Sequence, residues 1–429
     1  MLAGRMLPVV NVGRKSLVDY ATIATRGLMD EIRRLAEPMS GMRVLHLSAT
    51  AFGGGVAEIN YTLVPLMADA GLEVEWRIIE GAEEFYDVTK RIHNGLQGQP
   101  GALTEEQKQA FLRYQRINAD QLRNDYDFVI VHDPQPAGVI DLVEASRAKW
   151  IWRCHIDLST PDQDVLGFLL PSIRRYDAAI FHLADYVPAT EGLPECFIWP
   201  PAIDPLAPKN MALSAEDAAY IVDQFGVDVE RPLLVQVSRF DPWKDPLGVI
   251  DAYRLVKERF PEVQLALVGS MAHDDPEGWD YYNRTVAHAD GDSDIFILSN
   301  LNNVGSVEVN AFQVHSRAVI QKSVREGFGL TVSEALWKAR PTVAGAVGGI
   351  TVQIEDGATG WLVDSPARCA QACIEILRDP QEARERALRG KEHVRRNFLT
   401  PRLLRDWLAL FNRLSGNDAA DVELVKVAA

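Results

Sequence analysis

The stretch Arg43-Val-Leu-His-Leu-Ser48 predicts a buried β-strand. It leads into Phe52-Gly-Gly-Gly55, and from Val56 to Ala70 the apolar residues recur with helical spacing. A strand that passes through a glycine turn into a helix is a typical opening of an α/β domain. The glycine run lacks GxGxxG spacing, and Trp76-Arg-Ile-Ile79 ends the second strand without an acid for a ribose. The pattern therefore disfavours a nicotinamide oxidoreductase.

The alternation of strand and helix continues along the chain. Strand-like apolar runs recur, and helical stretches such as Glu105–Asn124 separate several of them. In chain order these runs are Val74–Ile79, Phe128–His132, Trp150–Cys154, Ala178–Phe181, Cys196–Trp199, Leu233–Val237, Gln264–Gly269, Ile295–Leu298, Ala318–Gln321, Thr342–Ala344 and Gly360–Val363. Strands that alternate with helices predict parallel sheets covered on both faces.

Three prolines in Trp199-Pro-Pro-Ala-Ile-Asp-Pro205 interrupt this alternation and predict a linker between two domains. We therefore expect a first domain over residues 1–204 and a second domain over residues 205–400. The first domain is expected to begin with a helical accessory segment from about Lys15 to Ala36.

The tail is amphipathic, rich in arginine and helical in pattern from Pro380 to about Ser415. Residues 401–429, with the apolar stretch Leu403–Leu414, are expected to cross back to the first domain. Two doubly wound domains joined by a short linker would turn the carboxyl ends of both sets of strands toward a shared cleft. Ligands bind at such strand ends, so the organisation indicates an enzyme that closes on two substrates.

Composition excludes several classes of function. A chain of 429 residues with a net charge of −16 lacks the basic face that nucleic-acid binding needs. The apolar stretch near the N-terminus is too short for a signal peptide or a membrane span, so we expect a cytoplasmic protein without a membrane partner. The cysteines form no disulfide framework and are expected to be buried free thiols. They are Cys154, Cys196, Cys369 and Cys373.

The segment Asp290-Gly-Asp-Ser-Asp294 is similar to a calcium loop only in part. Such a loop needs Gly in the sixth place and Glu in the twelfth, where Ile295 and Leu301 stand. We interpret the segment as a solvated turn and expect no bound metal.

The strongest candidate for a ligand site is Arg325-Glu-Gly-Phe-Gly-Leu-Thr-Val-Ser-Glu-Ala-Leu336, between a predicted strand and an apolar helix. Gly327 and Gly329 allow a tight turn that exposes N–H groups, and the helix that follows adds its positive dipole end. Glu334, in the second turn of that helix, can reach hydroxyls beside bound phosphates. The alternative is a plain glycine turn with solvated acids. Two acids at fixed offsets, Glu326 and Glu334, favour the ligand site.

A second candidate is Ser238-Arg-Phe-Asp-Pro-Trp-Lys-Asp245, directly after a predicted strand. Arg239 and Lys244 on this loop suit a diphosphate, because Arg gives forked hydrogen bonds and Lys a point charge. Taken alone, the segment is equally well explained as a solvated charged loop.

A third candidate is Arg153-Cys-His-Ile-Asp157, again after a predicted strand. His155 and Asp157 would point into the cleft from the first domain. A lone histidine is more often a structural hydrogen-bonding group than a catalyst. Its place at a strand end favours a functional role here.

Arg239 with Lys244, and Glu326-Gly-Phe-Gly-Leu330 with Glu334, resemble the donor site of the family-4 retaining glycosyltransferases. That family has the GT-B fold, two Rossmann-like domains that face a shared cleft. The resemblance implies that Arg239 and Lys244 hold the nucleotide diphosphate and that Glu334 holds the ribose. It implies that Glu326, with the neighbouring amides, holds the transferred sugar. The other donor-binding residues that it implies are Gly327, Phe328, Gly329, Leu330 and Thr331.

A narrower resemblance, to the trehalose synthases of the glycosyltransferring type, rests on longer segments. These segments are Ser48–Glu58, Phe85–Asn94, Val131–Gln135 and Val268–Glu277. Such enzymes join nucleotide-activated glucose to free glucose. The resemblance implies catalytic roles for Glu326, His155, Arg239 and Lys244. It also implies an acceptor pocket on the first domain, formed by Gly53, Gly54, Gly55, Lys90, His93, Asn94, Asp133, Gln135, His155 and Asp157.

The partners implied by this resemblance are a nucleotide-glucose donor and a glucose acceptor. We expect no tightly bound cofactor, Mg²⁺ only in company with the nucleotide, and a homodimer. Three alternatives stay open: a retaining trehalose phosphorylase, a family-4 enzyme with another acceptor, and an inactive sugar-binding homologue.

Overall fold

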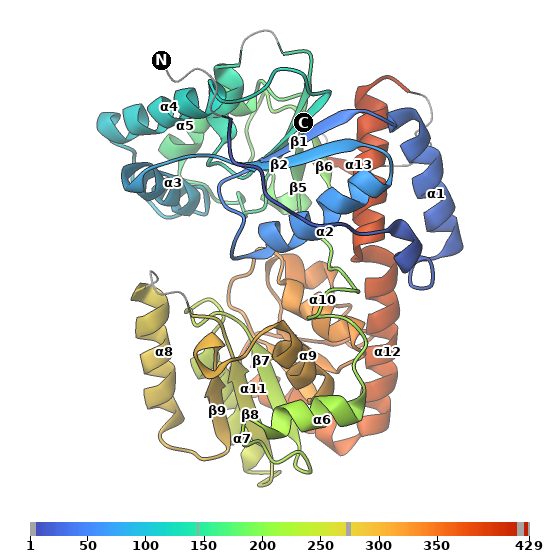
Figure 1. Ribbon diagram of the computed structural model, residues 1–429. Coiled ribbons are helices and arrows are strands. Elements are labelled where there is room, and N and C mark those ends of the chain that lie inside the picture. Colours follow the sequence, from blue (N-terminus) through green and yellow to red (C-terminus); the bar gives the residue numbers. More distant parts are fainter. Residues whose placement is uncertain (1–5, 144–145, 272–275, 418–423, 428–429) are drawn as a thin grey trace. The chain divides into compact units, whose positions relative to one another are not determined.

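The computed structural model describes residues 6–143, 146–271, 276–417 and 424–427. The chain divides into two compact units, coloured along the sequence in Figure 1. The first unit is Met1–Pro201 together with Thr400–Ala429, and the second is Ala202–Leu399. Within the described residues no helix has both the length and the apolar character needed to cross a membrane.

The first unit is built on a sheet that, in its described part, has the strand order β13-β6-β5-β4-β3-β1-β2. All neighbouring pairs are parallel except β13 with β6. The strands are β1 (Arg43–Ser48), β2 (Glu73–Ile78), β3 (Phe128–His132), β4 (Lys149–Arg153), β5 (Ala178–Phe181), β6 (Glu195–Ile198) and β13 (Lys426–Val427). The helices of this unit are α1 (Arg26–Ala36), α2 (Gly55–Asp69), α3 (Glu83–Leu96), α4 (Glu105–Ala119), α5 (Gln163–Ile173) and α13 (Thr400–Leu414).

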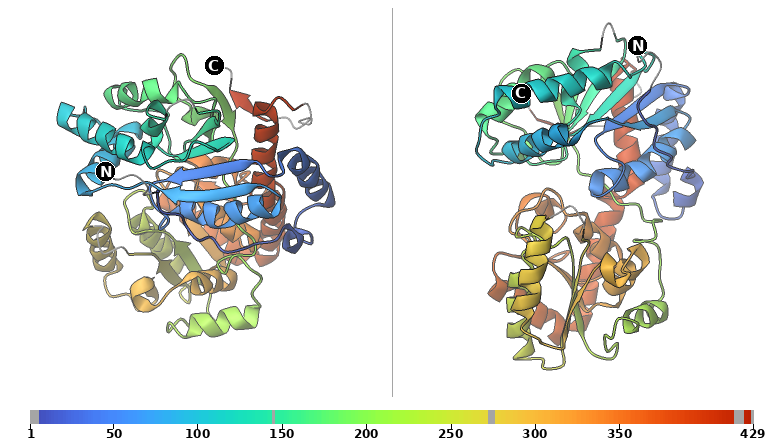
Figure 2. Two further views of the ribbon diagram at one scale, coloured as in Figure 1. Left: turned by 45° about the horizontal axis from the view of Figure 1, so that its top comes forward. Right: turned by 60° about the vertical axis from the view of Figure 1, so that its left-hand side comes forward.

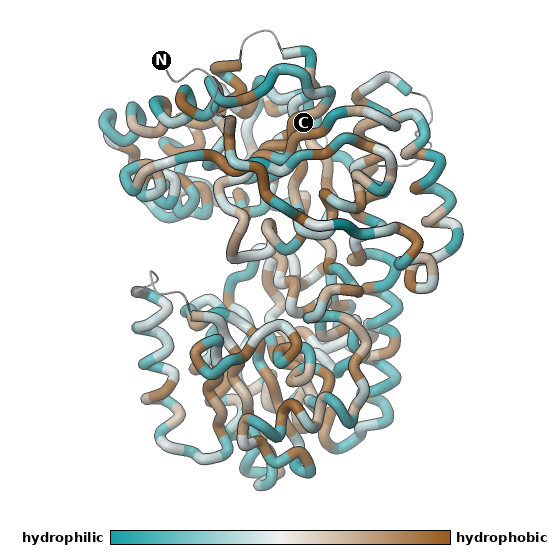
Figure 3. The backbone as a smooth tube through the Cα atoms, viewed as in Figure 1, coloured by the Kyte–Doolittle hydropathy of each residue, from teal (hydrophilic) through white to brown (hydrophobic). Residues whose placement is uncertain are grey.

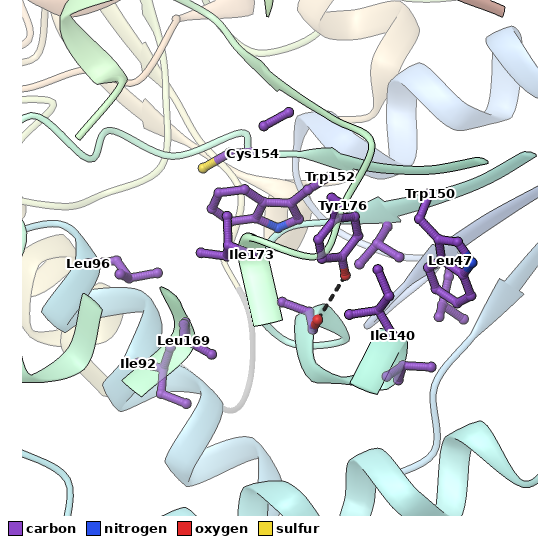
Figure 4. Close-up of a cluster of buried hydrophobic side chains, with 14 of the residues drawn as sticks. Leu47, Ile92, Leu96, Ile140, Trp150, Trp152, Cys154, Leu169, Ile173 and Tyr176 are labelled. Carbon is purple, nitrogen blue, oxygen red and sulfur yellow. Dashed lines mark hydrogen bonds between the residues drawn. The ribbon is translucent and has the colours of Figure 1, made fainter. Parts of the chain in front are cut away.

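The core of the first unit lies where strand side chains meet α3, α4 and α5 (Figure 4). Trp152 of β4 is fully buried there, with Ile92 of α3 and Leu169 of α5 in the same cluster. The hydroxyl of Tyr176 donates a 2.8 Å hydrogen bond to the carbonyl oxygen of Ala137, so its polar end is satisfied inside the apolar cluster.

The second unit has a described sheet of order β12-β11-β10-β7-β8-β9, parallel throughout. Its strands are β7 (Leu233–Val237), β8 (Gln264–Val268), β9 (Ile295–Leu298), β10 (Ala318–Gln321), β11 (Thr342–Gly345) and β12 (Trp361–Val363). Its helices are α6 (Ala215–Asp223), α7 (Pro246–Lys257), α8 (Pro276–Ala289), α9 (Ser306–His315), α10 (Leu330–Trp337), α11 (Pro366–Arg378) and α12 (Pro380–Asn397).

Both faces of the second sheet are covered, as the views in Figure 2 show. Leu234 and Leu265 pack in a cluster with residues of α7 and α11, whereas Leu233 and Ala266 pack in another with residues of α6 and α9. Because neighbouring strand residues point to opposite faces, this division accounts for the nearly continuous apolar runs in the strands (Figure 3).

The tail differs from the single helical stretch that its pattern predicts. It forms two helices, α12 and α13. Phe398 and Leu399 between them are not helical, and the carbonyl oxygen of Phe398 accepts a hydrogen bond from the amide of Ile203 at 2.8 Å instead of from the next turn of a helix. The second of these helices, α13, packs in the first unit beside α1 (Figure 1). There Asn412 donates to the carbonyl oxygen of Leu35 at 2.8 Å, and Phe411 stacks on Phe128.

The accessory segment, from about Lys15 to Ala36, is not the continuous helix that its pattern predicts. Residues Leu17–Tyr20 form a short 3-10 helix, and α1 begins only at Arg26. Thr25 has extended backbone angles and accepts a hydrogen bond from the amide of Leu28, so it caps a new helix rather than continuing an old one. A Thr inside a helical pattern is therefore a start signal here.

The four cysteines are free and buried, as the sequence predicts. The acidic segment near residue 290 is not simply a solvated turn. Lys257 contacts both Asp292 and Asp294 at 2.8 and 2.9 Å, and Arg231 pairs with Asp294 at 2.8 Å. The segment is thus an ion-pair cluster that fastens the start of β9. Within the described parts of the chain, no group of three or more His, Cys, Asp or Glu side chains is arranged to hold a metal ion.

Candidate active site

Two charged clusters that are far apart in sequence meet at the carboxyl edge of the second sheet. The ammonium of Lys244 lies 2.5 Å from Oε2 of Glu326, and their side chains are only 17% and 9% exposed. Ser323, just after β10, donates from its hydroxyl to the same carboxylate oxygen at 3.2 Å. Strands β7 and β10 are neighbours in the sheet, which is why the loops that follow them come together.

The loop after β7 is fixed by its own hydrogen bonds. Oδ1 of Asp241 accepts from the amides of Trp243 and Lys244 at 2.9 and 3.0 Å. Gln236 donates to the carbonyl oxygen of Lys244 at 2.7 Å. Lys244 is therefore held in place from both sides. Arg239, by contrast, is 67% exposed and lies 3.6 Å from Asp241.

Asp245 ends this loop and begins α7. Its backbone is left-handed, with φ of 50°, and its side chain caps the helix by accepting from the amide of Gly248 at 3.0 Å. The buried ammonium of Lys322 pairs with the same carboxylate. Lys322 and Lys244 thus form two separate ion pairs at one edge of the sheet.

The glycine loop before α10 approaches other backbone closely. Gly329 has φ of 82° and stands at the N-cap without a side-chain cap, so the first amides of α10 are not used by a capping side chain. A Cβ at Gly349 would lie 2.6 Å from Cα of Phe328. Gln353 also donates to the carbonyl oxygen of Phe328, at 2.5 Å. These contacts fix the shape of the loop at the start of α10.

Glu334, on α10, is 1% exposed. The ammonium of Lys209 lies 2.8 Å from Oε1 of Glu334 and forms an ion pair with it, but the angles of this contact are not those of a hydrogen bond. Within the described residues neither oxygen of the Glu334 carboxylate accepts a hydrogen bond. Burial lowers the pKa of the nearby Lys338 to about 7 against the opposing effect of Glu334. A buried carboxylate whose oxygens lack hydrogen-bond donors is chemically suited to hydroxyl groups.

In the first unit, Asp133 and His155 are brought together after the neighbouring strands β3 and β4. Oδ1 of Asp133 accepts from the backbone amide of His155 at 2.7 Å. Asp133 has φ of 64°, and its carbonyl oxygen accepts from the indole N–H of Trp152 at 3.1 Å. Burial raises the pKa of Asp133 to about 7, although the amide of His155 and the charge of Arg153 lower it.

Other residues predicted for the acceptor pocket lie on α3 and line a cavity that includes neither Asp133 nor His155. Lys90 and Asn94 of α3 line a cavity of about 230 Å³ together with Arg91. The segment after α3 is tied to the loop that follows β4, because the amide of Asp162 donates to the carbonyl oxygen of Gly95 at 2.9 Å. His93 is half-buried on the same helix.

Three of the predicted acceptor residues serve the local backbone. Asp157 accepts from the amide of Ser159 at 2.8 Å. The carbonyl oxygen of Gln135 accepts from the side chain of Gln115 at 2.8 Å. Gly54 has φ of 85° and stands at the N-cap of α2 without a side-chain cap; Gly53 and Gly55 flank it. Residues 272–275 of the predicted segment Val268–Glu277 lie outside the described residues.

Sequence reasoning missed several groups in these sites. His46 lies in β1, where its only sequence signal is a polar residue within an apolar run, and His132, at the end of β3, lies within the segment Val131–Gln135 but was given no role. Lys209 is far from Glu334 in sequence and gives no local signal at all. These groups become recognisable only when the sheet and the helices are assembled.

Comparison with known proteins agrees with this architecture. Residues 46–188 match the family model described as trehalose synthase, N-terminal domain, and residues 219–393 match the glycosyl transferases group 1. The chain is similar in fold to an α,α-trehalose-phosphate synthase (UDP-forming) from Burkholderia xenovorans in complex with glucose-6-phosphate. The TM-score is 0.69 at 15% identity, over 86% of this chain and 100% of that one. These likenesses define the class: the fold is that of the GT-B glycosyltransferases.

Sequence relatives narrow the class. A trehalose synthase from Rubrobacter xylanophilus is 60% identical over 418 residues, which cover 96% of this chain and 100% of the relative. A trehalose synthase from Pyrococcus horikoshii is 45% identical over 406 residues, 94% of this chain and 98% of the relative. The chain belongs to the trehalose synthase family.

Proposed function

We propose that this glycosyltransferase makes trehalose by transferring glucose, with retention of its α configuration, from a nucleoside diphosphate glucose to free glucose. The observation that carries the proposal is the Lys244–Glu326 pair beside the uncapped N-terminus of α10. A cation, a carboxylate and the first backbone amides of a helix at one strand edge suit a sugar diphosphate better than a neutral ligand.

Departure of a nucleoside diphosphate develops negative charge on the phosphates. Lys244 and the exposed Arg239 would neutralise that charge, and the amides at the start of α10 would donate to the phosphate oxygens. Glu326 then hydrogen-bonds hydroxyls of the transferred glucose. The unsatisfied carboxylate oxygens of Glu334 would accept hydrogen bonds from the hydroxyls of the ribose.

The acceptor half of the proposal rests on the first unit. At pH 7 the ring of His155 is neutral and the carboxyl of Asp133, with its pKa raised to about 7, is only partly ionised, so both offer hydrogen bonds to glucose hydroxyls at a lower desolvation cost than a full charge. No pair of carboxylates of the glycosidase kind is among the residues proposed here. We therefore propose attack of the acceptor hydroxyl on the face of the leaving group, with a phosphate oxygen receiving the proton.

A metal ion has no resident site in this proposal, and Mg²⁺ enters only with the nucleotide. The homodimer and the cytoplasmic location stay predictions. The direct test of function is to incubate the protein with ADP-, UDP- and GDP-glucose plus glucose, and separately with trehalose plus phosphate. A non-reducing α,α-linked product from the first reaction supports the proposal. Turnover only with trehalose plus phosphate identifies a phosphorylase. Binding of sugar without turnover in either reaction identifies a sugar-binding protein.

A further inference from the structure

Three imidazoles, two of them buried and the third partly exposed, form a continuous file in the first unit. Nδ1 of His46 lies 3.0 Å from Nε2 of His132, and Nδ1 of His132 lies 2.9 Å from Nε2 of His155. His46 is inside β1, His132 is the last residue of β3, and His155 follows β4 by two residues. Because β1, β3 and β4 are adjacent, the file runs from the middle of the sheet to its carboxyl edge.

All three rings are neutral at pH 7. Burial lowers the pKa of His46 to about 3 and lowers the pKa values of His132 and His155 well below the ordinary range. The charge of Arg153 acts in the same direction on His132 and His155. A neutral imidazole carries one N–H and one bare nitrogen, so each ring donates once and accepts once.

The inner end of the file decides which way the protons point. Nε2 of His46 lies 3.4 Å from Sδ of Met67. A thioether has no hydrogen to donate, so this contact is favourable only with the proton of His46 on Nε2. Asn60 lies on α2, the helix that also carries Met67. It raises the pKa of His46, as a hydrogen-bond acceptor would, although its side-chain amide is outside hydrogen-bond geometry.

The proton position in His46 fixes the proton positions in His132 and then in His155. With its proton on Nε2, His46 accepts at Nδ1, so Nε2 of His132 must donate to it. His132 then accepts at Nδ1 from Nε2–H of His155. The bare nitrogen of His155 is therefore Nδ1. Within the described residues no hydrogen-bond partner occupies that atom, and His155 is partly exposed.

We infer that His132, held in turn by His46, is a positioning residue that fixes His155 as the Nε2–H tautomer, with Nδ1 as an acceptor for a sugar hydroxyl. The backbone of His155 is fixed separately, by its amide bond to Asp133. The hydroxyl that meets His155 must then donate its proton, which orients its oxygen lone pairs toward other donors. The part about a sugar hydroxyl rests on the proposed function, whereas the tautomer does not.

The tautomer is measured directly by nitrogen NMR of the full chain labelled with ¹⁵N-histidine. The two nitrogens of a neutral imidazole differ strongly in shift according to which one is protonated, and the spectrum of His155→Gln assigns the ring. The inference expects protonated Nε2 and bare Nδ1 at His155. The reverse tautomer, or an even mixture of the two, overturns it.

Substitution of His132 provides a matched pair. In His132→Asn the amide oxygen replaces Nδ1 as the acceptor for His155, whereas His132→Leu removes it. We expect His155 to keep its tautomer in the first variant and to lose it in the second, with trehalose-forming kcat/KM about tenfold lower only in the second. Equal tautomer ratios at His155 in both variants overturn the positioning role.

The tautomer of His155 and the formation of trehalose are tested separately. A protein that shows the expected tautomer but makes no trehalose contradicts the proposed function and leaves the positioning inference intact. Should His132→Leu fail to fold, as judged by circular dichroism, the spectrum of the unsubstituted protein still decides the tautomer.

Discussion

The two sheets of this protein end in different chemistry. At the carboxyl edge of the first sheet the polar groups, apart from the buried and charged Arg153, are neutral or easily neutralised: imidazoles with lowered pKa values and a carboxyl whose pKa is raised to about 7. At the corresponding edge of the second sheet they are charged and paired, as in Lys244–Glu326 and Lys322–Asp245. A buried charge is tolerated only with a partner, whereas a neutral ring needs only hydrogen bonds. The same architecture therefore offers one edge suited to hydroxyls and one suited to phosphates.

The largest expected effect tests the charged edge. Lys244→Ala leaves Glu326 buried without its cation and removes a contact to the diphosphate, so we expect donor-dependent turnover to fall about a hundredfold. Steady-state kinetics with a nucleotide-glucose measure it. Lys257→Ala, at the opposite end of α7, also breaks ion pairs and is the control: it should lower thermal stability and leave kcat/KM near the parent value. Similar kinetics for the two variants would contradict the assignment of Lys244.

The pH dependence of the free energy of unfolding tests the neutral edge of the first sheet, through Asp133. The folded pKa of Asp133, about 7, is above its unfolded value near 3.8, so its contribution to stability is full below pH 3.8 and is lost as pH rises through 7. Asp133→Asn keeps the acceptor oxygen and the left-handed backbone but cannot ionise. We expect its free energy of unfolding, relative to the parent, to increase by about 1–3 kcal/mol between pH 5 and pH 8.

Urea unfolding of parent and Asp133→Asn at the two pH values measures this difference. The histidines bind protons over part of the same range, but they are present in both proteins, so the comparison cancels most of their contribution. A difference that is constant with pH would show that Asp133 is ionised as readily in the folded as in the unfolded chain.

A smaller effect separates Glu334 from the diphosphate contacts. Glu334→Gln keeps the shape of the side chain and weakens its acceptance of ribose hydroxyls, so KM for the donor should rise about tenfold with little change in kcat. A 2′-deoxyribose donor provides the cross-check. The parent should lose affinity for it, and the variant should discriminate much less. Undiminished discrimination in Glu334→Gln would place the ribose elsewhere.

The smallest expected effect concerns Arg239. Its side chain is mostly exposed, so screening weakens its attraction for phosphate, and Arg239→Ala should lower kcat/KM only severalfold. The loss should shrink further as salt is added. An effect as large as that of Lys244→Ala, and independent of salt, would mean that Arg239 becomes buried when the donor binds.

The parallel strands were predictable to within about a residue because each is a short apolar run between polar turns, whereas the two-residue strand β13 was missed, since residues 401–429 were expected to be helical. The charged edge was predictable as well, since Lys244 and Glu326 each lie in a compact local motif. The histidine file was not. His46 and His132 are 86 residues apart, and their contact depends on the register that sets His46 opposite Ile130 of β3. The prediction of one helical accessory segment was wrong because Thr25 caps a new helix, and the periodicity of apolar residues does not reveal a cap.

The return of the chain to its first unit has a consequence for biosynthesis. Phe411 lies against Phe128 of the interior strand β3, and Lys426–Val427 pairs with β6, so the first unit takes its last pieces from the end of the described chain. The ribosome delivers every residue of the second unit before those pieces emerge. The half of the protein that is translated first is therefore the half that finishes folding last, and until then its uncovered apolar surface is exposed to chaperones and to other nascent chains.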